Sequence, residues 1–338
     1  MNKQQLRIVF MGTPDFAVES LRALVEGGYN VVAVITMPDK PIGRHGNHLQ
    51  ASPVKQFAVE SNIPVLQPEK LKNPEFLQQL QDLKADLQIV VAFRMLPEAV
   101  WAMPPLGTFN LHASLLPQYR GAAPINWAVI NGETETGITT FFLQHDIDTG
   151  KIIQQVHVPI LASDNAGDVH DRLMQLGATL VTETVDNILA GTIAPIDQAL
   201  LTPAGTDLKP APKIFRETCQ ILWNQPAKRV YDFIRGLSPH PGAWTTLCEN
   251  NGSDATTVKI FEAKLTSEPI PQGEELAPGS IITDAGQLFV ACTDGLLAIQ
   301  QLQLAGKKRM PAADFLRGKT LDANAQFVYQ APENGEKC

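Results

Sequence analysis

The sequence predicts an α/β protein: a mostly parallel, Rossmann-like sheet followed by a smaller domain built from short strands. In the first half, apolar strand-like runs alternate with helix-like segments, as they do where helices connect parallel strands. In the second half, short strand-like runs separated by Gly, Pro and Asp predict a small β-barrel. A length of 338 residues fits about two domains.

The elements of the first domain follow from local patterns. Residues 7–11 form an apolar strand, and the turn at 12–16 opens a helix that Gly27 and Gly28 end. The apolar run 31–35 completes a βαβ unit, and Ser52 and Pro53 are suited to the start of the next helix. Further expected elements are strands at 63–66, 86–93 and 108–112, helices at 74–83, 123–130 and 164–189, and antiparallel strands at 137–143 and 151–158.

A stretch rich in Pro and Gly divides the chain. Residues 202–213 have the composition of an extended linker. We therefore expect a catalytic domain over 1–201, this linker, and a C-terminal domain over 214–332. Within the latter, the pattern predicts a helix at 225–236 and strands at 257–261, 279–283, 287–292 and 296–304.

Bulk properties narrow the class of protein. The N-terminus has no signal-peptide pattern and no apolar run approaches about 20 residues, so we expect a cytoplasmic protein without a membrane partner. A net charge of −8 argues against indiscriminate nucleic-acid binding, although local basic patches remain possible. The four cysteines are widely spaced and lack a C-x-x-C pair, which predicts free thiols and no metal site. They are Cys219, Cys248, Cys292 and Cys338.

Three polar residues within forty positions form the candidate catalytic set. In the strand 108–112, Asn110 and His112 point to one face, because side chains alternate along a strand. Asp148 follows in an Asp-Thr-Gly turn. An amide beside an imidazole whose protonation a carboxylate can set is suited to stabilising an oxyanion and moving protons at a carbonyl carbon. Taken alone, Asn-x-His also fits a structural histidine and a strand-end cap.

Other catalytic signatures are missing from the sequence. It has no G-x-G-x-x-G, no P-loop, no His-Glu-x-x-His and no G-x-S-x-G pattern. A nicotinamide cofactor is therefore not expected. By elimination, Asn110, His112 and Asp148 are the one set in the sequence that carries chemistry.

Several ordered blocks resemble the folate-dependent formyltransferases, and most closely those that act on an aminoacylated tRNA. The resemblance rests on FMGTPDFA at 10–17, PDKPIGR at 38–44, SPVK at 52–55, NLHASLLP at 110–117, RGAAP at 120–124, DTG at 148–150, RGLSPHPGAW at 235–244 and AGKK at 305–308. It covers nearly the whole chain. It implies transfer of the formyl group of 10-formyltetrahydrofolate, a co-substrate, to the α-amino group of methionine on initiator tRNA, without a metal.

The resemblance also implies where both substrates bind. Folate would lie near the loop Phe93, Arg94, Met95 and Leu96, the turn Ser114, Leu115, Leu116 and Pro117, and Asp146. Here Ala92–Pro97 departs from the A-Y-G-x-x-L-P pattern of the family, which leaves the side chains that contact the pterin open. Met95 and Leu96 are equally compatible with ordinary core positions.

The expected contacts with tRNA lie in two basic segments. The loop 37–51 is longer than a strand-to-helix connection needs, and the resemblance implies that Lys40 and Arg44 contact the acceptor arm. The second domain resembles an oligonucleotide-binding (OB-like) barrel, on which Lys307, Lys308 and Arg309 would extend the positive track. As isolated patches, both segments also fit ordinary solvated surface charge.

Two other interpretations compete with this one. A related enzyme could use an amino sugar or water as the acceptor, but the basic loop favours tRNA. A non-enzymatic RNA-binding module of the same architecture would not need the titratable trio. We also expect the protein to be a monomer.

Overall fold

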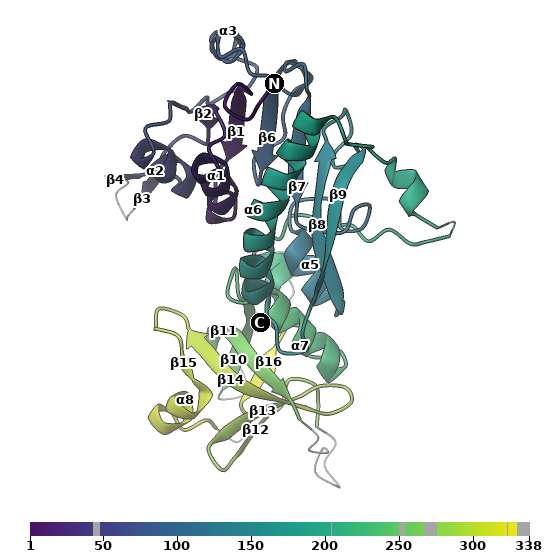
Figure 1. Cartoon of the computed structure of the whole chain (residues 1–338). Coiled ribbons are helices and arrows are strands. Elements are labelled where there is room, and N and C mark those ends of the chain that lie inside the picture. The colour runs from purple at the N-terminus through teal and green to yellow at the C-terminus, as the bar shows by residue number, and fades with distance from the viewer. Residues whose placement is uncertain (43–47, 204, 250–253, 267–275, 323, 330–338) are drawn as a thin grey trace. The chain divides into compact units, whose positions relative to one another are not determined.

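The computed structural model describes residues 1–42, 48–203, 205–249, 254–266, 276–322 and 324–329 (Figure 1). The chain folds as two compact units. The first comprises residues 1–124, 135–159 and 170–212, and the second comprises 125–134, 160–169 and the chain from 213 onward. Two short segments of the first half thus group with the second unit. The domain bounds expected from the sequence stay a prediction.

A seven-stranded, mostly parallel sheet forms the centre of the first unit, as predicted. Its strand order is β5-β2-β1-β6-β7-β8-β9. The pairs up to β6–β7 are parallel, whereas β7–β8 and β8–β9 are antiparallel. The strands are β1 (Ile8–Gly12), β2 (Val31–Ile35), β5 (Val65–Leu66), β6 (Leu87–Val91), β7 (Thr108–His112), β8 (Glu135–Phe142) and β9 (Ile152–Pro159).

Two helices of the first half begin at a side chain that caps them, and the cap at Ser52 was predicted. The Ser52 hydroxyl accepts a hydrogen bond from the Lys55 amide at 3.1 Å, and Pro53 occupies the first helical position. The Asn73 side chain caps the next helix in the same way through the Glu75 amide at 2.9 Å. The helices are α1 (Asp15–Glu26), α2 (Pro53–Glu60), α3 (Pro74–Asp82), α4 (Glu98–Trp101), α5 (Pro124–Ile130) and α6 (Ala166–Ala190). No helix in the described part of the chain is long and apolar enough to cross a bilayer.

The loop 37–51 contains a small hairpin that the sequence pattern did not predict. Strands β3 (Lys40–Ile42) and β4 (His48–Gln50) pair antiparallel, with Lys40 opposite Gln50. Three-residue strands are too short to show an alternation of apolar and polar residues, so no periodicity marks them in the sequence. Arg44 lies outside the described residues.

The predicted linker is extended, and it is hydrogen-bonded to the first unit. The Tyr119 amide donates to the carbonyl of Lys209 at 2.7 Å, and the Ala211 amide donates to the carbonyl of Arg120 at 2.8 Å. The Ala122 amide in turn donates to the carbonyl of Ala211 at 2.7 Å. Ala211 is fully buried. The linker therefore supports the segment that follows the turn after β7.

The second unit contains a curled antiparallel sheet of OB-like type, as predicted. The strand order is β12-β13-β14-β11-β10-β16, with β15 paired to β14 (Figure 1). An isolated β-bridge between Ser280, just before β12, and Gln326 of β16 joins the two edge strands of this sheet. The elements are α7 (Ala227–Gly236), β10 (Ala243–Glu249), β11 (Asp254–Leu265), β12 (Ile281–Asp284), β13 (Gln287–Ala291), β14 (Leu296–Leu304), β15 (Met310–Pro311), α8 (Ala312–Gly318) and β16 (Gln326–Val328).

Candidate active site

Strand β7 presents Asn110 and His112 on one face of the sheet. Leu111 points to the opposite face, where its side chain lies against Gly177 of α6 so closely that an added Cβ would meet it at 2.7 Å. Asn110 stands in register with Val90 of β6, whose side chain belongs to the apolar cluster that includes α3. The alternation of the strand thus places both polar residues on the sheet face away from α6.

His112 is buried, and both of its ring nitrogens face oxygen atoms. Its Nε2 donates a hydrogen bond to the carbonyl of Tyr119 at 2.9 Å. Its Nδ1 lies 3.9 Å from Oδ2 of Asp148. Because a carbonyl oxygen only accepts, Nε2 carries the proton in the first contact, whereas Nδ1 and the carboxylate are farther apart than in a hydrogen bond. The longer separation at Nδ1 leaves this nitrogen available to a substrate atom or a water.

Asp148 is held in place through its side chain. Its Oδ2 accepts a hydrogen bond from the Gly121 amide at 3.0 Å, and 12% of the side chain is exposed. Gly121 has a φ of 129° and lies against Ala211, so that an added Cβ would meet the Ala211 carbonyl at 2.3 Å. A side chain at position 121 would therefore displace the backbone that supplies this donor.

The side-chain oxygen of Asn110 is buried. Among the described residues, its Oδ1 has no hydrogen-bond partner. Leaving a buried acceptor unpaired costs about 1–3 kcal/mol. Such an atom beside His112 is suited to bind a group that a substrate brings.

Residues with left-handed backbone conformations gather around the trio. Ala92 follows β6 with a φ of 46°, Tyr119 has a φ of 60°, and Asp148 has a φ of 53°. This region is uncommon for residues other than glycine and is unusual for Tyr. Strained backbone of this kind concentrates at functional sites, which supports a candidate site at this sheet edge.

Two of the three segments predicted to contact folate leave the sheet at the same end as His112, whereas Asp146 lies in the connection between β8 and β9. Residues 92–97 follow β6 and residues 113–117 follow β7, and these strands are parallel neighbours. Met95 is 75% exposed, whereas Leu96 is buried in the apolar cluster of β1 and β6. The other positions range from buried to exposed: Ser114, Leu116 and Pro117 are buried, Phe93, Arg94 and Leu115 are partly buried, and Asp146 is exposed.

Arg94 lies where the chain departs from the family pattern, and its side chain is hydrogen-bonded to a neighbouring segment. Its Nη1 donates to the carbonyl of Glu69 at 2.8 Å, and its Nη2 donates to the carbonyl of Pro68. Partial burial lowers the pKa of this guanidinium from its usual value. The side chain thus joins the loop after β6 to the segment after β5.

An ion pair joins the two ends of the β3–β4 segment. Lys55 Nζ lies 2.6 Å from Oδ2 of Asp39, and Gln67 donates to Oδ1 of Asp39 at 2.8 Å. These two partners hold the pKa of Asp39 below its usual range. Because the folded-state pKa is lowered, the contribution of this pair is complete above the ordinary carboxyl pKa and is lost as the pH falls through the folded-state value.

We expect Asp39→Asn to loosen the base of the hairpin and to lower the midpoint of thermal unfolding by less than about 4 °C, since a partly exposed ion pair contributes little. Thermal unfolding at pH 6, 7 and 8 checks this. The decrease should be equal at all three values, because the lowered pKa keeps the Asp39 carboxylate ionised throughout; a decrease that changes with pH would contradict the role given to this pair.

The predicted basic residues of the second unit are exposed, and one of them, Arg309, contacts neighbouring side chains. Arg309 lies over the Phe261 ring at 4.6 Å, and its Nε donates to Gln301 at 2.6 Å. Lys307 and Lys308 lie in the turn after β14. In the first unit, Lys40 is exposed on β3.

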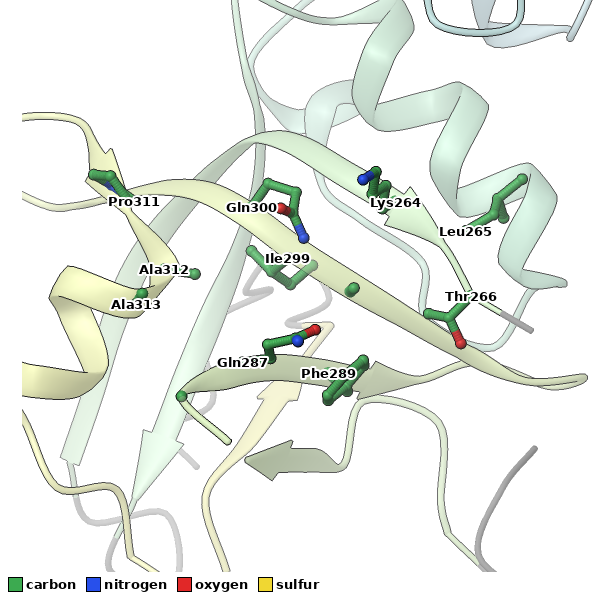
Figure 2. A pocket seen from close by; sticks show the side chains of 12 residues that line it. Lys264, Leu265, Thr266, Gln287, Phe289, Ile299, Gln300, Pro311, Ala312 and Ala313 are labelled. Atoms are coloured by element: carbon green, nitrogen blue, oxygen red, sulfur yellow. The ribbon is translucent and has the colours of Figure 1, made fainter. Parts of the chain in front are cut away.

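A cavity in the second unit contains none of the predicted site residues. It has a volume of about 610 Å³ and lies on the sheet between β11, β13, β14 and the start of α8 (Figure 2). Its charged lining residue is Lys264, beside Gln287, Phe289 and Gln300.

Elsewhere in this unit, burial raises the pKa of the Cys292 thiol to about 12, which makes Cys292 unsuitable as a nucleophile. Cys338 lies outside the described residues.

Sequence reasoning missed the partners that support the trio. The carbonyl of Tyr119, the amide of Gly121 and the side chain of Gln198 hold His112 and Asp148. Backbone groups carry no residue-specific signal. Gln198 stands after a long helix, fifty positions from Asp148, so no motif links the two residues.

Two formyl transferase family models match this chain. The formyl transferase family model matches residues 6–185, and the formyl transferase C-terminal domain model matches residues 213–320. The fold and these two matches define a two-domain formyl transferase. A solved sugar 3N-formyl transferase, WlaRD, supports the fold with a TM-score of 0.61 at 20% identity, over 90% of this chain and 99% of that chain.

Relatives over nearly the whole length narrow the class. The methionyl-tRNA formyltransferase of Bacteroides fragilis is 65% identical over 319 residues, covering 94% of this chain and 96% of the relative. That of Bacteroides thetaiotaomicron is 64% identical, covering 94% of this chain and 97% of the relative. The chain belongs to the methionyl-tRNA formyltransferase family.

Proposed function

We propose that this enzyme transfers the formyl group of 10-formyltetrahydrofolate to the α-amino group of methionyl initiator tRNA. The observation that carries the proposal is the contact between His112 and Asp148, which lies 36 positions later in the chain. His112 shares strand β7 with Asn110. The folate co-substrate is supported by WlaRD, which was solved in the presence of 5-N-formyl-THF. The tRNA acceptor is supported by the names of the relatives.

The trio is suited to stabilising the tetrahedral intermediate. The methionyl amine attacks the formyl carbon, a C–N bond forms, and the carbonyl electron pair moves onto oxygen. Nδ1–H of His112 and the Asn110 amide donate to this oxyanion, at the point where negative charge develops. The Asp148 carboxylate stabilises the imidazolium by its opposite charge.

A proton must also move before the intermediate collapses. The attacking amine becomes an ammonium, and N10 of the folate needs a proton to leave. Asp148, which is partly exposed, accepts the ammonium proton directly or through a water and returns it to N10. The C–N10 bond then breaks, which gives formylmethionyl-tRNA and tetrahydrofolate.

An acceptor comparison tests the proposal. The protein is incubated with 10-formyltetrahydrofolate and, separately, methionyl initiator tRNA, methionyl elongator tRNA, a nucleotide-linked amino sugar, or no acceptor, and the tetrahydrofolate formed is measured. We expect rapid product formation with the initiator tRNA alone. Equal turnover without an acceptor would indicate a hydrolase, and turnover with the sugar would indicate the other branch of the superfamily.

The segment 37–51 is proposed to contact the acceptor arm. Reversing a charge there, in Lys40→Glu or Arg44→Glu, should raise the KM for methionyl-tRNA by about tenfold, since a phosphate contact is lost and a repulsion is added. The KM for 10-formyltetrahydrofolate should remain within about twofold. Steady-state kinetics with each substrate varied in turn check this; equal increases for both substrates would count against the role of the segment.

A further inference from the structure

A buried glutamine beyond the trio is bonded to the loop that carries Asp148. Gln198 opens the short 3₁₀ helix η1 (Gln198–Leu201) and is only 2% exposed. Its Nε2 donates to the carbonyl of Asp148 at 2.9 Å and to that of Gly150 at 2.8 Å. One amide group thus uses both of its N–H donors on the backbone that flanks Thr149.

The oxygen of the same amide accepts hydrogen bonds from the Arg120 side chain. Gln198 Oε1 accepts from Arg120 Nε at 3.1 Å and from Arg120 Nη2 at 2.6 Å. Arg120 directly precedes Gly121, whose amide donates to the Asp148 carboxylate. The contacts therefore close a ring through Gln198, Asp148, Gly121 and Arg120, which fixes both the backbone and the side chain of Asp148.

Backbone hydrogen bonds to β9 and to the linker hold the segments that carry Gln198 and Arg120. Ile196, two residues before Gln198, exchanges two backbone hydrogen bonds with Ile152 of β9, both at 2.8 Å. On the far side, the Arg120 carbonyl accepts from Ala211 of the linker. Gln198 lies in a stretch, 186–212, that neither formyl transferase family model covers.

We propose that Gln198 is a positioning residue that holds Asp148 in the conformation it needs to act on His112; this inference rests on the proposed function. Asp148 has a left-handed backbone, with a φ of 53°, which the surroundings must maintain. The two hydrogen bonds from Gln198 Nε2 do so. Because a displacement of about 1 Å in a catalytic group reduces rates by about 10²-fold, loss of these bonds should act on kcat.

Two substitutions separate the two ends of the amide. Gln198→Leu removes all four hydrogen bonds. Gln198→Glu keeps an acceptor for Arg120 but places carboxylate oxygens against the carbonyls of Asp148 and Gly150. We expect kcat to fall by about 10²-fold in both variants, with the KM of either substrate within about threefold of wild type.

Gln154→Leu is the matched control. Gln154 is a partly buried glutamine on β9 whose Oε1 accepts from Thr184 at 2.9 Å. Its replacement should change kcat by less than about threefold. Thermal unfolding of all variants is measured in parallel, so that lost activity can be compared at equal folded fraction.

A double-mutant cycle decides whether Gln198 acts through Asp148. If it does, Gln198→Leu lowers kcat strongly in the wild-type background and by less than about threefold in an Asp148→Asn background. Equal losses in both backgrounds, or a near-normal kcat for Gln198→Glu, would overturn the inference. If the wild-type protein does not formylate methionyl-tRNA at all, the proposed function fails instead, so the two failures are distinguishable.

Discussion

Replacing His112 by alanine is expected to lower kcat by at least about 10²- to 10³-fold, the usual effect of losing one oxyanion donor. The variant removes the proposed Nδ1–H donor and the imidazole ring that faces Asp148. The KM values should change little, because the interaction strengthens as charge develops on the formyl oxygen. Steady-state formylation of methionyl-tRNA, with circular dichroism to verify folding, provides the measurement.

His157→Ala is the control for this variant. His157 lies on β9, is largely exposed, and contacts Glu135 at 3.0 Å. Its loss should leave kcat within about twofold of wild type. A His112→Ala protein that is folded and formylates at a near-normal rate would remove His112 from the mechanism.

Asp148→Asn should lower kcat by about 10²- to 10⁴-fold, the range typical of a general acid or base. The amide keeps the size of the side chain, and its oxygen can still accept from the Gly121 amide. It cannot take up a proton or stabilise a positive charge on His112. The effect should therefore fall on the chemical step and leave substrate binding intact.

Pre-steady-state kinetics test this second expectation. With both substrates bound, formyl transfer is followed in a single turnover in wild type, in Asp148→Asn and in Asp171→Asn, an exposed carboxylate of α6. The last variant should behave as wild type. If Asp148→Asn slows only product release and leaves the single-turnover rate unchanged, proton transfer by Asp148 is refuted.

The sequence predicted those parts of the fold that depend on local patterns. The parallel sheet follows from apolar runs at β1, β2, β6 and β7, and the Ser52 cap marks the start of α2. The hairpin β3–β4 was missed because its strands are short and polar. In the second unit β10 was missed although its partner β11 follows it directly, and β16 was missed because it is short and its partner β10 is distant in the sequence.

The candidate site was predictable in its side chains and not in their supports. Alternation along β7 placed Asn110 and His112 on one face, and the Asp-Thr-Gly turn identified Asp148. The supports of the trio are the backbone groups of Tyr119 and Gly121 and the side chain of Gln198, and the last of these is fifty positions from Asp148. Such contacts arise from tertiary packing, which no short window of sequence encodes.

The destination of the formyl group is the most direct test of the central claim. The protein is incubated with 10-formyltetrahydrofolate carrying a ¹³C-labelled formyl group and with methionyl initiator tRNA; the aminoacyl ester is then hydrolysed and the products are identified by mass spectrometry. We predict labelled N-formylmethionine as the main product. Label recovered as formate, with the methionine unmodified, would contradict the assignment.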